Sequence, residues 1–97
     1  MDNKLELLLK IASEYWNVPE SQITTRSRKR EVVEKRQILH YISANEKIAN
    51  MHQIGLFFGG HDHVTVMHSR KTISNLMYDF DIKTDVVEIT RRFNCTL

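Results

Sequence analysis

The sequence predicts an all-α domain with a five-helix, bundle-like arrangement. Apolar residues recur at spacings of three and four along most of the chain, and no stretch shows the alternation of a half-buried strand. Apolar residues make up 41% of the 97 residues and charged residues 27%, which is typical of a folded globular chain. This length favours a single domain, residues 1–97, with a modest core.

The first two helices are expected at residues 5–16 and 31–44. Each has one apolar face: Leu5, Leu8, Leu9, Ile11, Ala12, Tyr15 and Trp16 in the first, and Val32, Val33, Ile38, Leu39 and Ile42 in the second. Pro19 is expected to end the first helix, because proline disfavours the helical conformation of the preceding residue. The connecting PESQITTRSRKR is expected to be a loop, with at most a short turn at residues 20–23.

Three further helices are expected, at residues 50–58, residues 62–78 and around residues 86–93. Asn50 and Gln53 have the spacing of a capping box, and Asp62 is placed to cap the fourth helix. Gly59 and Gly60 separate these two helices, since glycine readily adopts the left-handed conformation of a helix end. The polar segment DFDIKTD is expected to separate the fourth helix from the last one.

Positive charge is concentrated in one segment of a nearly neutral chain. Residues 24–37 carry six cations and two acids, a net charge of +4, whereas the remaining residues carry a net charge of −2. The basic loop at residues 24–30 contributes Arg26, Arg28, Lys29 and Arg30. A local positive field of this kind favours a polyanionic partner, although a solvated loop with charged decoration is the alternative.

Several classes of protein are disfavoured. No apolar run approaches the roughly 18 residues of a membrane span, so no membrane partner is expected. The N-terminal MDNKLELLLK contains acids and lacks the small-residue cleavage site of a signal peptide. The single Cys95 cannot form an intramolecular disulfide, which fits a reducing cytoplasm.

The segment FFGGHDHVTVMHSRK, residues 57–71, is rich in residues that bind metals or anions. His63 and His68 are five residues apart, roughly 140° around a helix, which does not match the spacing of metal-binding helices. The segment lacks the lysine and the preceding strand of a phosphate-binding loop. No nucleophile has a credible partner. We therefore expect no metal, no cofactor, no small-molecule substrate and no enzymatic activity.

The same segment fits a helix-turn-helix at about residues 50–78. In that motif the second helix enters the major groove of DNA with its first residues against base edges. Those residues are His61, Asp62, His63, Val64 and Thr65. Histidine can donate to guanine, aspartate can accept from cytosine, and valine can contact the thymine methyl group. The alternative is two core helices joined by a tight turn.

These residues resemble a known family. IGLFFGGHDHVTVMHSRKTI, residues 54–73, is similar to the signature of the C-terminal DNA-binding domain of the bacterial replication initiator DnaA. EYWNVPESQI, RSRKR and KRQ resemble that family's first helix, basic loop and second-helix start. The resemblance implies a replication initiator/Trp repressor-like fold that binds DnaA boxes in double-stranded DNA. It places Arg28 in a minor groove, and phosphate contacts at Arg36, Gln37 and the neighbourhood of Arg26.

This chain departs from the family pattern at three positions. His61 replaces a lysine or arginine, Val64 replaces a hydroxyl residue, and Thr72 replaces a cation. A neutral histidine weakens a base or phosphate contact, and valine loses a hydrogen bond but keeps a methyl surface. We expect DNA binding to tolerate these changes more easily than specificity for the standard box does.

The family's ATPase domain has no counterpart in these 97 residues. The chain is then either an excised domain or a stand-alone relative, and the Met1-Asp2 start and the end at Leu97 favour the latter. A second hypothesis is a regulator that binds other replication initiation proteins. A third is a transcription repressor with altered DNA specificity, for which no ligand-binding residues are evident.

Overall fold

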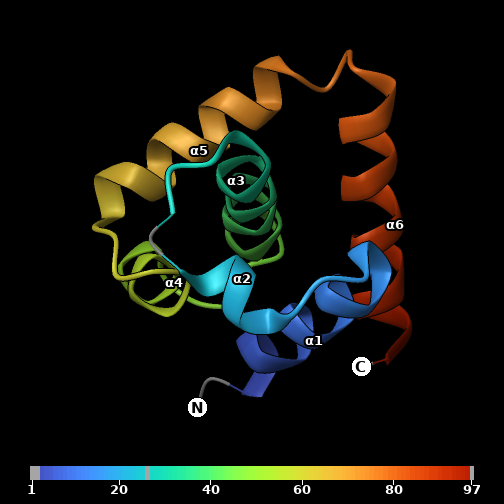
Figure 1. Cartoon of the computed structure of the whole chain (residues 1–97), viewed down its shortest axis with the longest axis horizontal. Helices are drawn as coiled ribbons and strands as arrows, with labels where there is room; N and C mark the ends of the chain where they lie inside the picture. The colour runs from blue at the N-terminus through green and yellow to red at the C-terminus, as the bar shows by residue number, and fades with distance from the viewer. Residues whose placement is uncertain (1–2, 26, 97) are drawn as a thin grey trace.

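Helix α3 runs through the centre of the molecule, and the other helices pack around it (Figure 1). The computed structural model describes residues 3–25 and 27–96. Within these ranges the chain forms six helices and no strand, which confirms the all-α prediction. The helices are α1 (Asn3–Trp16), α2 (Glu20–Thr24), α3 (Arg30–Asn45), α4 (Met51–Phe57), α5 (His63–Asn75) and α6 (Phe80–Thr96).

The structure has one helix more than predicted, α2, in the segment for which the sequence predicted a loop with a short turn at residues 20–23. Pro19 precedes it with φ −64° and ψ 145°, and its carbonyl accepts a hydrogen bond from the Gln22 N–H at 3.0 Å. Ile23 is the buried residue of this helix, at 1% exposure. A single turn with one buried side chain has no apolar periodicity, so the sequence indicated no more than the short turn at residues 20–23.

The last helix begins earlier than predicted. The segment DFDIKTD was expected to separate two helices, but most of it is helical because α6 starts at Phe80. The preceding helix, α5, already ends at Asn75. Asp79 caps the start of α6: its Oδ1 accepts hydrogen bonds from the Asp81 N–H at 2.9 Å and the Ile82 N–H at 3.3 Å. The buried face of α6 therefore starts within the acidic segment, with Ile82, Val86, Ile89 and Phe93.

The predicted capping of α4 and α5 is confirmed. Asn50 Oδ1 accepts from the Gln53 N–H at 2.8 Å, and Gln53 Oε1 accepts from the Asn50 N–H at 3.2 Å. Asp62 Oδ1 accepts from the Thr65 N–H at 2.9 Å. Gly59 and Gly60 have φ values of 115° and 71°, the left-handed backbone that favours glycine and lets the chain turn between the two helices.

Helices α1 and α6 are joined by polar contacts that sequence patterns did not indicate. The Tyr15 hydroxyl donates to Asp85 Oδ1 at 2.9 Å, and Trp16 Nε1 donates to Asp85 Oδ2 at 3.2 Å. Both aromatic residues are only half-buried, so they cover the edge of the core and do not fill its centre. In Figure 1, α6 lies on the opposite side of α3 from α4, and α1 runs below α3.

A histidine lies at the junction of α3 with the α4–α5 pair. His40 has no exposed surface, and its Nδ1 is hydrogen bonded to the Ser69 Oγ at 2.9 Å. Its ring meets those of Phe58 and His61 edge to face, with centroids 5.9 and 6.2 Å away. Burial, followed by the nearby His61 and Arg36, lowers the pKa of His40 to about 3. His40 is therefore neutral in the folded protein at physiological pH.

A glycine allows α4 to approach the start of α5. The His61 N–H donates to the Gly55 carbonyl at 2.8 Å, so the returning chain lies directly on this residue. A Cβ atom at position 55 would overlap the His61 carbonyl oxygen and lie 3.0 Å from that of Asp62. These are backbone atoms, which cannot rotate away as a side chain can.

Gly55→Ala is expected to lower the free energy of unfolding by about 1–3 kcal/mol, the usual cost of overpacking a tight contact. The start of α5 must shift to admit the methyl group. Urea denaturation measures this loss, and the neighbouring Leu56→Ala is the matched control because Leu56 is 56% exposed. Equal stability of the two variants would contradict the role assigned to Gly55.

The depressed pKa of His40 predicts acid sensitivity. The unfolded chain binds a proton at this residue near pH 6.5, whereas the folded protein binds it only near pH 3. The free energy of unfolding is thus unaffected by His40 above pH 6.5. Below that pH, protonation of His40 in the unfolded chain lowers it by at most about 1.4 kcal/mol per pH unit. NMR titration of the imidazole measures this directly. A His40 ring that titrates near pH 6 in the folded protein would contradict it.

Candidate nucleic-acid interface

The basic loop begins beside the turn of the helix-turn-helix. A Cβ atom at Gly59 would lie 3.3 Å from the Thr24 carbonyl oxygen, so the end of α2 lies against the α4–α5 turn. The link from α2 to α3 then runs beside the α4–α5 turn (Figure 1). Thr24 and Gly59 are 35 positions apart in the sequence, so two distant segments meet at one edge of the domain.

Arg36 holds the basic loop against α3. Its side chain is 7% exposed, and Nη1 donates to the carbonyl oxygens of Thr25 at 2.8 Å and Ser27 at 3.4 Å. The Ser27 Oγ in turn accepts from the Lys29 N–H at 3.1 Å. The guanidinium expected to contact a phosphate thus points into the protein, where it fixes the path of the loop backbone.

The other predicted cations of the loop point outward. Arg28, Lys29 and Arg30 are exposed, whereas Gln37 on α3 is half-buried. Arg26 lies outside the described residues, so its predicted role stays a prediction. The described part of the loop therefore presents three cations to solvent on a backbone that Arg36 holds in place.

The first turn of α5 carries the remaining predicted residues. Asp62, His63 and Val64 are exposed, and Thr65 is half-buried. The Thr65 hydroxyl donates to Asp62 Oδ1 at 3.0 Å. Hydrogen bonds from the backbone and then the hydroxyl of Thr65 lower the pKa of Asp62, so the capping carboxylate stays ionised at neutral pH.

His61 also faces the protein. It is half-buried, and its ring packs against that of His40. A Cβ atom at Gly59 would come within 3.1 Å of the His61 Nε2. The imidazole is therefore folded back over the turn between α4 and α5.

The outward face of α5 continues past its first turn. Met67, His68 and Lys71 are exposed, while Val66, Ser69 and Ile73 form the buried side. The sequence prediction stopped at Thr65, although the spacing of residues 64, 67, 68 and 71 already indicated a common face.

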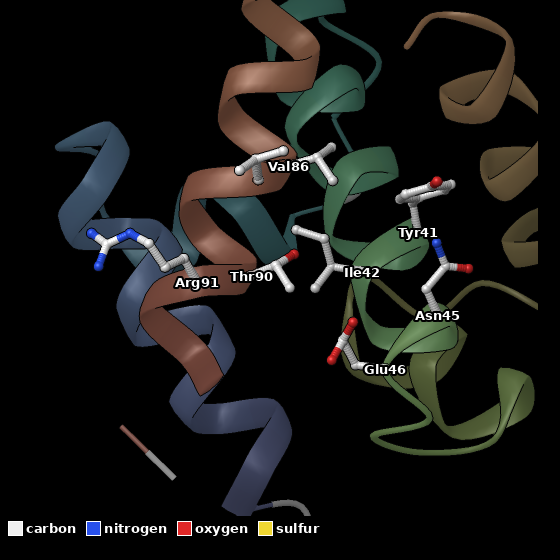
Figure 2. Close-up of a pocket in the computed structure, with 8 residues that line it drawn as sticks. Tyr41, Ile42, Asn45, Glu46, Val86, Thr90 and Arg91 are labelled. Carbon is white, nitrogen blue, oxygen red and sulfur yellow. The ribbon is translucent and has the colours of Figure 1, made fainter. Parts of the chain in front are cut away.

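A pocket lies away from this interface, between α3 and α6 (Figure 2). It has a volume of about 390 Å³, and its lining includes the apolar residues Ile42, Val86 and Val87. Glu46 and Arg91 add one charge of each sign. None of the residues predicted to contact DNA lines it.

None of the helices in residues 3–25 and 27–96 has the length and apolar character needed to cross a bilayer. In the same ranges, no three side chains of histidine, cysteine, aspartate or glutamate come together as a metal site would require.

The chain is similar to one protein family over most of its length. The family model described as the bacterial dnaA protein helix-turn-helix matches residues 5–73, which include the basic loop, α4 and most of α5.

Individual relatives agree with this match. The chain is 40% identical over 83 residues to the chromosomal replication initiator protein DnaA of Bacteroides thetaiotaomicron, an alignment covering 84% of this chain and 18% of that protein. It is 33% identical over 88 residues to the DnaA of Chloroflexus aggregans, covering 90% of this chain and 18% of the relative. It is 30% identical over 89 residues to the DnaA of Rhodopseudomonas palustris, an alignment covering 92% of this chain and 19% of that protein.

The chain spans about a fifth of the length of these relatives. The match falls on the helix-turn-helix part of the family and includes the basic loop and the turn described above. The chain belongs to the bacterial DnaA helix-turn-helix family.

Proposed function

We propose that this domain binds double-stranded DNA at sites resembling DnaA boxes, and that it acts in replication initiation or its regulation. The observation that carries the proposal is the meeting of the basic loop with the helix-turn-helix. One duplex can contact both, because the loop leaves α2 beside the α4–α5 turn. The relatives named as chromosomal replication initiators support this function, and a chromosomal ligand implies a cytoplasmic location in a bacterium.

In this proposal α5 enters the major groove. His63 donates to guanine or a phosphate, and Val64 contacts a thymine methyl group. Asp62 uses Oδ1 for capping, which leaves Oδ2 for the amino group of cytosine. Thr65 and His61 support the turn: the first through its hydrogen bonds to Asp62, the second through its contact with His40.

The basic loop is proposed to follow the phosphate backbone and reach the neighbouring minor groove. Arg28 is the candidate for the minor groove, where arginine is favoured by the strong negative potential. Lys29, Arg30 and Gln37 are candidates for phosphate contacts, and Arg26 retains its predicted role there. Arg36 is a positioning residue, because its guanidinium is hydrogen bonded to loop carbonyls and largely buried.

Selection from a pool of random duplexes tests the function. The enriched sequences are expected to resemble DnaA boxes, with changes at the positions that Val64 faces. Binding is expected to weaken steeply with salt, since released counterions contribute much of the affinity. Failure to bind any duplex at micromolar protein and low salt would show that the proposed function is wrong.

Arg28→Ala is expected to weaken duplex binding about tenfold and to lower the magnitude of the salt slope by about one unit. Fluorescence anisotropy over a series of salt concentrations measures both quantities. Lys83→Ala is the matched control, because it removes one exposed cation from α6. An equal effect of the two substitutions would indicate general attraction to charge instead of a contact by Arg28.

Arg36→Lys separates a positioning role from a phosphate contact. Lysine keeps the charge but cannot reproduce the planar arrangement that reaches the Thr25 and Ser27 carbonyls. Affinity is expected to fall about tenfold, and amide exchange in residues 27–29 is expected to accelerate. Near wild-type affinity, with unchanged exchange, would contradict the positioning role.

A further inference from the structure

Helix α6 and the residues just before it carry exposed apolar side chains in addition to those that α6 buries in the core. Phe80 is 79% exposed and Val87 is 54% exposed. They are seven positions apart, about two helical turns, so they lie on one face of the helix. Tyr78, which precedes α6 by two residues, is 83% exposed. The core of the domain therefore leaves an exposed stripe, formed by Tyr78, Phe80 and Val87, in contact with solvent.

The pocket between α3 and α6 lies next to this exposed stripe. Val87 belongs to its lining, with Thr90 on the α6 side and Tyr41 on the α3 side. In Figure 2, Thr90 and Ile42 face each other across the pocket. A hollow beside exposed apolar side chains is typical of a surface that binds another protein.

Two charged residues line the pocket, Glu46 just after α3 and Arg91 on α6. In Figure 2, the Arg91 side chain extends from α6 on the side away from α3. The ion pairs within residues 3–25 and 27–96 are those of Glu88 with Arg91 and Arg92. Glu46 thus has no ion-pair partner among these residues. The Arg91 guanidinium has five N–H donors, so its pair with Glu88 leaves it able to bind a second carboxylate.

A second copy of this chain is the partner that these charges fit. In a two-fold interface both copies present the same surface, so that surface must be complementary to itself. A pocket lined by one acid and one cation from different helices meets this condition, because Glu46 of each copy can pair with Arg91 of the other. A polyanion is disfavoured as the partner, since the charges of the lining cancel, in contrast to the basic loop.

We infer that the pocket and the exposed stripe form a two-fold dimer interface between copies of this chain. Phe80 and Val87 become buried there, and Glu46 of each copy pairs with Arg91 of the other. Because α6 lies on the opposite side of α3 from α4, both helix-turn-helix motifs stay accessible in the dimer (Figure 1). The surface is small for an interface, so a dissociation constant on the order of 10–100 μM is expected. The inference does not rest on the proposed function, since the dimer requires no DNA.

Sedimentation equilibrium of the full chain without DNA, at concentrations up to about 1 mM, measures the dissociation constant of the dimer. Glu46→Arg and Arg91→Glu are each expected to raise it at least about tenfold, because symmetry turns two attractive contacts into two repulsive ones. An equimolar mixture of the two variants is expected to return to within about threefold of the wild-type value. In the mixed dimer one copy carries two cations at these positions and the other carries two acids. A merely structural effect of either substitution would not be rescued by mixing.

Val87→Asp is expected to abolish dimerisation at every concentration, because it places a charge in the apolar part of the interface. Val64→Asp is the matched control, since Val64 is a 57% exposed valine on α5, outside the inferred interface. This variant is expected to dimerise as the wild type does. Circular dichroism checks that each variant is folded.

Three results would overturn the inference. The first is a wild-type chain that stays monomeric at every concentration, which would leave the pocket open to a different protein. The second is a dimer that survives Val87→Asp, which would place the contact on another surface. The third is a mixture of the two charge variants that associates no better than either variant alone. None of these results bears on the proposed function, which the selection from random duplexes tests separately.

Discussion

The packing of α5 against α3 is the interaction on which the rest of the domain depends. The hydrogen bond between His40 and Ser69 joins the two helices, and the rings of Phe58 and His61 close over the same histidine. One turn earlier on α3, Arg36 holds the carbonyls of the basic loop. A single helix therefore positions both segments proposed to meet DNA. The placement of the basic loop relative to the helix-turn-helix is therefore set by contacts with α3.

The long helices could be predicted from the sequence because their apolar residues repeat every three or four positions. The caps at Asn50 and Asp62 were also predictable, because a capping side chain has a fixed position relative to the turn it serves. Helix α2 has one turn and one buried residue, which gives no periodic signal. The start of α6 was misjudged because acids near Asp79 looked like an interruption, although they favour the first turn of a helix.

The candidate site was predicted less completely than the fold. Composition identified the basic loop as a surface for a polyanion, but it does not show which cations turn inward. Arg36 shares helical spacing with the buried Val32, Leu39 and Ser43, so a signal existed; the usual preference of arginine for solvent outweighed it. The inward packing of His61 on His40 depends on residues more than twenty positions apart, and a single sequence contains no pattern that connects them.

The buried Arg36 has a consequence for the kinetics of recognition. Because its guanidinium fixes the carbonyls of Thr25 and Ser27 in the free protein, the loop loses its conformational entropy during folding and not when a ligand arrives. Encounter with a polyanion then needs no slow ordering step, so association can be rapid and similar for many sequences. Differences between sites are expected to reside in their lifetimes, as the domain samples one site after another and remains longest where the bases fit.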